Sequence, residues 1–437
     1  MIRFKPLLGL DYILFACTLA LMVIGILFIY SSGVSSAGVN YSTEYIRQII
    51  WASVGLLIMI IFTYFDYNQL RGLSLYLYLG VILLLILTLF LGQEHNGAKS
   101  WLAWGRVGFQ PSEFAKLSTG LFLGLYLENT RKDSASLKRF LTALGIMLVP
   151  FGLIFIQPDL GTSMVFLPMF IIITFIAGVK IRYLFFLVAC SFLSVVIGML
   201  PAWEEFIAGH KVEALQFLIS PAYVKVVLLS ASLIFLISLT GFFLIKKKYY
   251  YWISYCVSIL FSGLLGGMAV RNILKVYQIK RLIVFIDPSI DPRGAGWNVI
   301  QSVTAVGSGG LWGKGFLKGT QSHFRFLPQQ STDFIFSIIA EEWGFMGCLL
   351  VFALFMIILI RSFWILLKTR DAFALYSGSA CLGMIFVHFI INIGMAMGIM
   401  PITGIPLFFL SYGGSALWTG VLGVSLLMNI NKNRHPY

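Results

Sequence analysis

Apolar runs of roughly 20 residues recur along almost the whole chain, and short polar connections separate them. Each run is long enough to cross a hydrocarbon core of ~30 Å as an α-helix. About twelve runs can be marked, at 11–31, 47–65, 73–92, 113–128, 139–157, 160–178, 183–200, 223–245, 251–270, 333–360, 373–399 and 406–428. The pattern predicts an all-α polytopic membrane protein. A barrel would instead show alternating segments of ~10 residues.

The composition supports a membrane class. Hydrophobic residues make up 59% of the chain and charged residues 11%, and soluble domains need far more charge on their surfaces. The apolar run at 12–30 is too long for the core of a signal peptide, and no convincing cleavage site follows it. We therefore expect a retained first span. All five cysteines fall inside apolar runs, which favours buried thiols without disulfides or metal.

The net charge of +14 indicates topology rather than nucleic acid, because basic residues gather in the cytoplasmic loops of membrane proteins. With the N-terminus in the cytoplasm, the loops that fall inside are basic: "NTRKDSASLKR", "GVKIRY", "IKKKYY", "IRSFWILLKTR" and the tail "NKNRHPY". Both termini are therefore expected in the cytoplasm.

The three longest outer connections are 93–112, 201–222 and 271–332, and the third breaks the charge rule. It carries most of the basic residues predicted outside: Arg271, Lys275, Lys280, Arg281, Arg293, Lys314, Lys318 and Arg325. Attraction to anionic lipid headgroups explains such charge. An anionic substrate at the outer membrane surface explains this charge equally well. The first part of the third connection, 271–286, is typical of an amphipathic interfacial helix.

Two polar stretches border predicted spans. In "QPSEFAKLS", Glu113 and Lys116 are three residues apart and share a helix face. They form either a local ion pair at the start of a span or a group in which Lys116 faces a polar cavity. In "QPDLGTS", Asp159 either caps the next helix or lines a site at membrane depth.

The stretch "FIDPSIDPRGAGWNVIQS" carries two Asp-Pro pairs, at Asp287 and Asp291. Aspartate before proline is commonly a turn former. Asp291 is followed by Arg293 and by two glycines, Gly294 and Gly296, which allow close approach of the backbone. This combination places a possible base beside a cation.

Three further stretches could carry chemistry. The glycine-rich segment 307–334 contains Lys314 and Lys318 and could cradle a phosphate with its amides, although it lacks a Walker motif. Glu341 and Glu342 lie within a predicted span, which would suit transport. For His388 and Asn392, four residues apart, interhelical hydrogen bonds are favoured over catalysis.

A last stretch, "PITGIPLFFLSYGGSA" at 401–416, is typical of a broken or re-entrant segment. Its Ser411 is a candidate substrate-binding residue.

The chain resembles the SEDS family (shape, elongation, division and sporulation), and within it the RodA branch more than the FtsW branch. The resemblance covers nearly the whole length and is carried by "NGAKSWLAWGRVGFQPSEFAKL", "QPDLGTS", "FIDPSIDPRGAGWNVIQSVTAVGSGGLWGKGFLKGTQS", "FLPQQSTDFIFSIIAEEWG" and "NIGMAMGIMPITGIPLFFLSYGGSA". It implies one membrane domain, 1–437, that polymerises lipid II at the outer face of the bacterial cytoplasmic membrane. Family members commonly have ten spans, so 223–270 would be an inserted helical hairpin.

The resemblance also implies site residues and partners. Asp291 would be the catalytic base, with Asp287 as the second choice. Substrate-binding residues would be Glu113, Lys116, Asp159, Arg293, Lys314, Lys318 and Ser411. The partners would be a class B penicillin-binding protein, lipid II and membrane lipids, without nucleic acid. No cofactor is certain, although a divalent cation could accompany the pyrophosphate.

Two departures from the family pattern stand out. Ser100 occupies the position of a usual arginine, for which Lys99 could substitute, and Leu407-Phe408 replaces a usual Leu-Pro. Two other functions remain open at this point: a transporter that flips lipid II, and a scaffold that only recruits the penicillin-binding protein.

Overall fold

The computed structural model describes residues 10–95, 98–104, 107–274, 276–292 and 294–433. Each predicted apolar run corresponds to a helix. These helices are α1 (Tyr12–Gly33), α2 (Glu44–Tyr64), α3 (Tyr67–Leu91), α4 (Pro111–Asn129), α5 (Leu137–Ile156), α6 (Leu160–Ile176), α7 (Ile181–Trp203), α9 (Pro221–Ile245), α10 (Lys248–Ile273), α14 (Ile335–Leu367), α15 (Ala372–Ala396) and α16 (Gly414–Asn433). Among the described residues, nine of them are long and apolar enough to cross a membrane. The prediction of an all-α polytopic membrane protein is confirmed.

The predicted start of the last span is wrong. The run 406–428 begins as a helix only at Gly414, because the segment before it is non-helical. The predicted outer loop 271–332 contains α11 (Val276–Ile286), the short helix η4 (Pro288–Ile290), α12 (Ala295–Ser308) and α13 (Thr320–His323). The broken segment predicted at 401–416 is therefore confirmed before residue 414, and most of the long loop is short helices.

The chain divides into two compact units: Met1–Val179 with Gln301–Tyr437, and Lys180–Ile300. The centre of the first unit is α15, which is mostly buried and packs against α4, α6, α14 and α16. Gly120 and Gly124 of α4 lie against Ala380 and Ser377 of α15, where a Cβ on either glycine would come within 2.7 and 3.1 Å of its neighbour. Small residues permit this close helix packing in the absence of a hydrophobic driving force.

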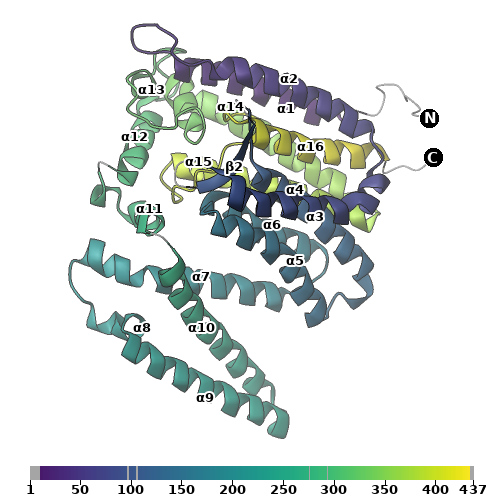
Figure 1. The fold of residues 1–437 in the computed structure, drawn as a ribbon, viewed down its shortest axis with the longest axis vertical. Helices are drawn as coiled ribbons and strands as arrows, with labels where there is room; N and C mark the ends of the chain where they lie inside the picture. Colours follow the sequence, from purple (N-terminus) through teal and green to yellow (C-terminus); the bar gives the residue numbers. More distant parts are fainter. Residues whose placement is uncertain (1–9, 96–97, 105–106, 275, 293, 434–437) are drawn as a thin grey trace. The chain divides into compact units, whose positions relative to one another are not determined.

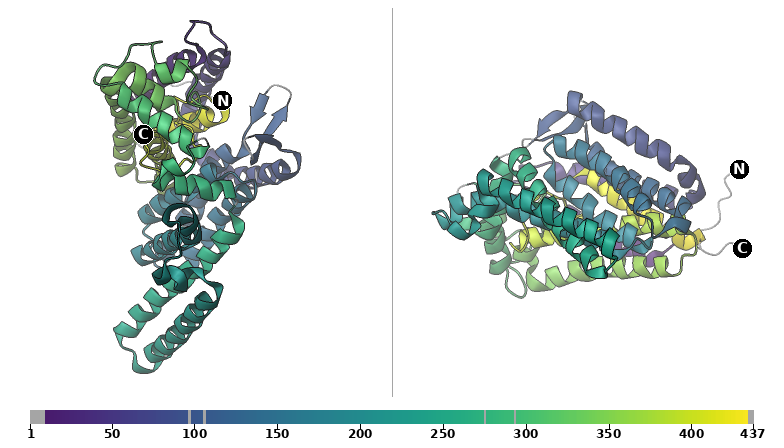
Figure 2. Two further views of the ribbon diagram at one scale, coloured as in Figure 1. Left: turned by 90° about the vertical axis from the view of Figure 1, so that its left-hand side faces the viewer. Right: turned by 90° about the horizontal axis from the view of Figure 1, so that it is seen from below.

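A three-stranded antiparallel sheet follows α3 and was not predicted. Its strands are β1 (Gln93–His95), β2 (Ala98–Trp104) and β3 (Val107–Phe109), with β2 in the centre. The left view of Figure 2 shows the strands projecting past the end of α3. On β2, Lys99 is exposed and Ser100 is buried, in keeping with the alternation of faces along a strand.

The second unit contains α7 and the helices α9 and α10, which run side by side (Figure 1). Gly198, Gly263 and Gly267 bring α7 and α10 into close contact. Arg271, predicted among the outer cations, donates from its guanidinium to the carbonyls of Ile197, Leu218 and Ile219. Its charge therefore stabilises the carbonyl ends of local chain segments.

Candidate functional site

A buried lysine lies in the second turn of α4. Pro111 is the first residue of that helix and needs no hydrogen-bond partner for its nitrogen. Glu113 and Lys116 follow on one face, and the Lys116 Nζ donates to Glu113 Oε1 at 2.7 Å. The Lys116 side chain has no exposed area and that of Glu113 only 1%. The predicted ion pair is confirmed, and both of its side chains are buried.

His388 of α15 completes this group. The Lys116 Nζ lies 2.8 Å from His388 Nε2, and His388 Nδ1 lies 2.9 Å from the carbonyl oxygen of Pro406. The imidazole stacks on Phe408 with 3.8 Å between ring centroids, and the Lys116 Nζ lies 5.5 Å from the centre of the same ring. We call Glu113, Lys116 and His388 the lysine cluster.

The lysine cluster keeps unused hydrogen-bonding capacity. Among the described residues, Glu113 Oε2 has no hydrogen-bond partner, and the same holds for the hydroxyls of Ser112 and Thr119 on the same helix. An ammonium has three donors, and the partners described for Lys116 use two of them. A buried carboxylate oxygen without a partner is costly, so it calls for an explanation beyond folding.

The non-helical segment between α15 and α16 is held in place by polar side chains. Asn392 donates to the carbonyls of Asp333 and Ile405, which lie in non-helical segments, so its bonds are not interhelical. The interhelical contact predicted for this pair is made by His388 of α15 with Lys116 of α4. The Ser411 hydroxyl accepts from the Leu407 amide at 2.9 Å. Ser411 is buried and closes a local turn, and its predicted contact with substrate stays a prediction.

Asp159 caps α6, as predicted, by accepting from the Thr162 amide at 3.1 Å. Its second oxygen accepts from the Gln110 side chain, also at 3.1 Å. Gln110 is the residue before α4, so this bond joins the start of α4 to the start of α6. The structure thereby brings the "QPSE" and "QPDL" stretches together.

A second polar group surrounds a break in α14. Gly344 has φ +64 and ψ −158, which interrupts the helix. The glycine-rich loop fills the break: the Phe345 amide donates to the Gly310 carbonyl at 2.9 Å, and the Lys314 amide donates to the Glu341 carbonyl at 3.0 Å. The loop thus supplies partners to backbone groups that a helix end leaves unpaired.

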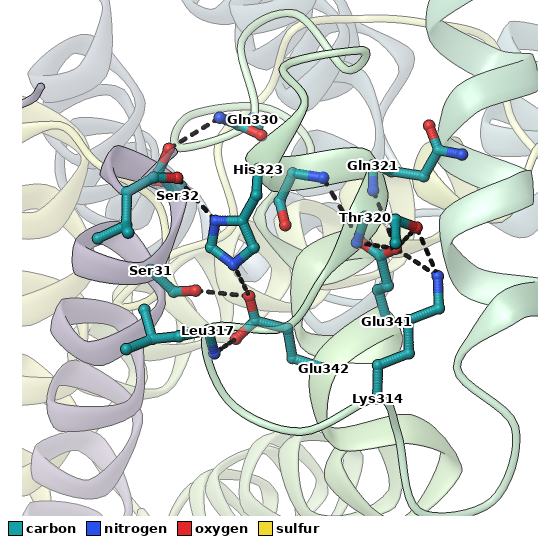
Figure 3. Close-up of polar contacts among 12 residues, drawn as sticks. Ser31, Ser32, Lys314, Leu317, Thr320, Gln321, His323, Gln330, Glu341 and Glu342 are labelled. Carbon is teal, nitrogen blue, oxygen red and sulfur yellow. Dashed lines mark hydrogen bonds and ion pairs between the residues drawn. The ribbon is translucent and has the colours of Figure 1, made fainter. Parts of the chain in front are cut away.

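The carboxylates of Glu341 and Glu342 hold this loop, as Figure 3 shows. Glu341 accepts from the Lys314 Nζ at 2.7 Å, from the amides of Thr320 and Gln321 at 2.8 and 3.0 Å, and from the Thr320 hydroxyl and the Ser322 amide. Glu342 accepts from Ser31 at 2.5 Å and from the Leu317 amide at 3.1 Å, and His323 Nε2 lies 3.4 Å away. We call Lys314, His323, Glu341 and Glu342 the loop anchor.

The loop anchor changes the meaning of the glycine-rich stretch. Its amides do cradle an anion, but the anion is the chain's own Glu341. Lys314 is committed to that carboxylate, whereas Lys318 is exposed. No sequence pattern near Glu341 predicts this pairing, because its partners lie about twenty residues earlier in the chain. The predicted roles of both lysines in binding substrate stay predictions.

The segment with the two Asp-Pro pairs lies in the second unit. Asp287 accepts from the amide and the hydroxyl of Ser289, at 2.9 and 2.6 Å, and these bonds lower the pKa of its carboxyl. Its predicted role as a turn former is confirmed.

Asp291 lies immediately after η4 and is partly exposed. A Cβ at Gly294 would come within 2.3 Å of the Asp291 carboxylate, and one at Gly296 within 2.2 Å of the Pro288 carbonyl. The two glycines therefore permit the close backbone approach that the sequence predicted. Arg293 lies outside the described residues.

Within the described ranges, no group of three or more His, Cys, Asp or Glu side chains could hold a metal ion. The possible divalent cation stays a prediction about the bound substrate. His388 is the functional candidate whose partner the sequence did not reveal: its Lys116 contact spans 272 residues. In the sequence, only its spacing of four residues from Asn392 indicated that His388 has a polar role.

Comparisons with known proteins agree along nearly the full length. A family model described as cell cycle protein, for FtsW, RodA and SpoVE, matches residues 11–209 and 206–436. The peptidoglycan glycosyltransferase RodA of Treponema pallidum (strain Nichols) is 46% identical over 435 residues, which are 99% of this chain and 100% of that protein. The peptidoglycan glycosyltransferase MrdB of Escherichia coli (strain K12) is 32% identical over 97% of this chain and 94% of its own length.

Among solved structures, a chain of a peptidoglycan synthase complex that coordinates polymerization and crosslinking aligns with a TM-score of 0.68 and 27% identity. The alignment covers 98% of this chain and 99% of that one.

Proposed function

The chain belongs to the FtsW, RodA and SpoVE family of cell cycle proteins, and from this membership we propose that it polymerises lipid II into glycan strands for cell elongation and rod shape. It is a peptidoglycan glycosyltransferase and a multi-pass membrane protein. The observation that carries the proposal is the 46% identity to a peptidoglycan glycosyltransferase along 99% of the chain.

We propose that the reaction occurs at the outer face of the cytoplasmic membrane, with both termini inside. The basic short connections on one side of the spans support this orientation through the positive-inside rule. Lipid II carries a disaccharide-pentapeptide on undecaprenyl pyrophosphate, so its sugar and its phosphates lie at the membrane surface. The cations of 271–332 fit such an anionic substrate.

The proposed chemistry is a single displacement. The 4-hydroxyl of a GlcNAc on one lipid-linked glycan attacks the anomeric carbon of another, and a new C–O bond forms. The anomeric carbon's bond to the pyrophosphate oxygen breaks, and the leaving undecaprenyl pyrophosphate keeps the electron pair. A hydroxyl is a poor nucleophile, so a base must accept its proton. Inversion at the anomeric carbon follows from this scheme.

We assign the base to Asp291. Its carboxylate lies against Gly294, at a place that a side chain on residue 294 would fill, and it is partly exposed. Asp287 remains the second choice, and its carboxylate accepts from the amide and the hydroxyl of Ser289, the bonds of a turn former.

We assign the stabilisation of the departing pyrophosphate to cations. Lys318 is preferred to Lys314 because Glu341 already binds the Lys314 ammonium. Arg293, two residues after the proposed base, is a further candidate from the sequence. Lys116 would act on the departing pyrophosphate from the start of α4, because a charge in a medium of low dielectric interacts strongly with charge that develops in the transition state. Glu113, Asp159 and Ser411, which lie at helix starts and turns, are the further proposed substrate-binding residues.

A partner is also proposed. One structural relative is a chain of a complex that couples polymerization to crosslinking. We infer that this chain likewise pairs with a crosslinking class B penicillin-binding protein. A transport function loses its main support, since Glu341 and Glu342 are bound by the loop and do not line a path.

The test is a polymerisation assay with the purified chain. Lipid II is supplied in detergent with and without the cognate penicillin-binding protein, and glycan polymer is measured. Polymer is expected from the wild type and not from Asp291→Ala. A chain that moves lipid II across vesicle membranes without forming polymer is a transporter, and one that does neither is a scaffold. Undiminished polymer from Asp291→Ala would remove Asp291 from the mechanism.

A further inference from the structure

The tautomer of His388 follows from its two contacts. The carbonyl oxygen of Pro406 can only accept a hydrogen bond, so His388 Nδ1, 2.9 Å away, must carry the hydrogen. In a neutral ring Nε2 then has a lone pair and accepts from the Lys116 ammonium at 2.8 Å. His388 therefore serves as a neutral acceptor for a buried cation.

The imidazole is fixed in its orientation. Besides the Pro406 bond, its face stacks on Phe408 with 3.8 Å between centroids and 16° between the ring planes. His388 has no exposed area and Phe408 has 1%. Because Nδ1 is hydrogen-bonded and one face of the ring is stacked, the lone pair on Nε2 points in a single direction.

The second carboxylate oxygen of Glu113 is an alternative partner for the Lys116 ammonium, and the contact with His388 keeps the ammonium from binding it. Glu113 Oε1 already accepts from the ammonium, while Glu113 Oε2 has no partner among the described residues. Without an acceptor at position 388, the ammonium would turn to engage both oxygens of Glu113, because an unpaired N–H in an apolar interior is costly. Such a closed pair would withdraw the lysine charge from any other anion.

We propose that His388 is the positioning residue that holds the Lys116 ammonium in the orientation glycosyl transfer requires, an inference that rests on the proposed function. His388 does not touch the reacting atoms; it acts through Lys116. Phe408 and Pro406 belong to the same device, since they fix the ring.

Two variants test the roles of the two ring nitrogens, Nδ1 and Nε2, separately. In His388→Gln, the amide oxygen can take the place of Nε2 and accept from Lys116. In His388→Asn, the shorter amide can donate to Pro406 in place of Nδ1 but does not reach Lys116. Polymerisation of lipid II by His388→Asn should fall about 10- to 100-fold, as expected for a misplaced charged group, while His388→Gln stays close to wild type.

A double-mutant cycle distinguishes the positioning role from a role of His388 in packing alone. In the Lys116→Met background, His388→Asn should cause little further loss of polymerisation, because the residue through which it acts is gone. Thermal unfolding of each variant in detergent reports the folded fraction, and rates are taken per folded molecule.

The outcomes are distinct. A wild type that makes no polymer contradicts the proposed function itself. If the wild type polymerises, the positioning role is overturned by full activity of His388→Asn, by His388→Gln as weak as His388→Asn, or by additive losses in the Lys116→Met background.

Discussion

The lysine cluster and the loop anchor contain the same kinds of group, a lysine bound to a glutamate at 2.7 Å with a histidine beside them, yet they differ in saturation. In the loop anchor all four carboxylate oxygens of Glu341 and Glu342 accept hydrogen bonds. In the lysine cluster Glu113 keeps one oxygen without a described partner. The difference lies in the carboxylates: those of the loop anchor are saturated although His323 Nε2 has no hydrogen-bond partner among the described residues, whereas that of Glu113 is not saturated.

This difference separates two uses of buried charge. A carboxylate that is saturated by backbone amides stabilises the fold, because every desolvated lone pair regains a partner. A pair that remains partly unsatisfied costs stability, and functional sites are where such costs are found. Residue type alone would not have distinguished the two groups, since each pairs a lysine with a buried glutamate.

The largest expected effect is on the stability of the loop anchor. Glu341→Ala leaves the Lys314 ammonium and the amides of Thr320 and Gln321 without their acceptor. Breaking a buried pair by removing one partner typically costs about 3–5 kcal/mol. Thermal unfolding in detergent should show a large fall in Tm. Lys314→Met is the control and should lower Tm less, because Glu341 keeps its bonds to the amides of Thr320 and Gln321; an equal fall would show that those amide bonds do not stabilise the loop.

The next effect is on activity and should be confined to the lysine cluster. Lys116→Met should lower lipid II polymerisation per folded molecule about 100-fold, which is the cost of removing one preorganised electrostatic group. Lys314→Met should lose activity only in proportion to the protein that fails to fold. The measurement is the polymer formation rate normalised to the folded fraction. Equal losses per folded molecule would show that saturation does not distinguish the groups.

A smaller effect concerns the backbone of the loop anchor. Gly313 has φ +78, and a Cβ there would come within 2.1 Å of the Glu342 carbonyl oxygen. Gly313→Ala should therefore destabilise the fold by about 1–3 kcal/mol. The control is Gly307→Ala in α12, where nothing lies within 4 Å and where alanine should stabilise the helix by about 1 kcal/mol. Shifts of Tm with the same sign would contradict the contact.

The smallest expected effect is a pH-dependent contribution of Asp287, a third carboxylate with bound donors, to the stability of the fold. Its pKa is lowered from the ordinary value of 3.8 by the bonds from Ser289. A lowered pKa in the folded state means that the cap stabilises the fold above the unfolded value and stops doing so as pH falls through the folded value. The Tm difference between wild type and Asp287→Ala should thus be small and constant at neutral pH and vanish in acid. A difference that grows on acidification would contradict this cap.

Local patterns predicted local structure well. Apolar runs marked the long helices, the spacing of Glu113 and Lys116 gave their ion pair, and the positions of Asp159 and Asp287 after or before proline gave caps. Each of these features depends on residues within a turn or two of one another. The physics that determines them can therefore be read from a short stretch of sequence.

Contacts between distant segments could not be predicted in this way. His388 meets Lys116 across 272 residues, and Glu342 meets Ser31 across 311. The break in α14 at Gly344 also depends on the loop that fills it, since glycine inside an apolar run does not by itself end a helix. The sequence does not predict the strand β2, because "AKSWLAW" ends in four successive apolar residues and lacks the regular alternation typical of a half-buried strand.

The most direct test of the central claim changes one functional group at each of the two outer aspartates. Polymer formation per folded molecule is measured for Asp291→Asn and Asp287→Asn with lipid II. Loss of the base should lower the rate about 10²- to 10⁴-fold in Asp291→Asn, because an amide cannot accept the hydroxyl proton. Asp287→Asn keeps an acceptor for the Ser289 amide and should polymerise like wild type. Equal rates for the two variants would contradict the assignment of Asp291.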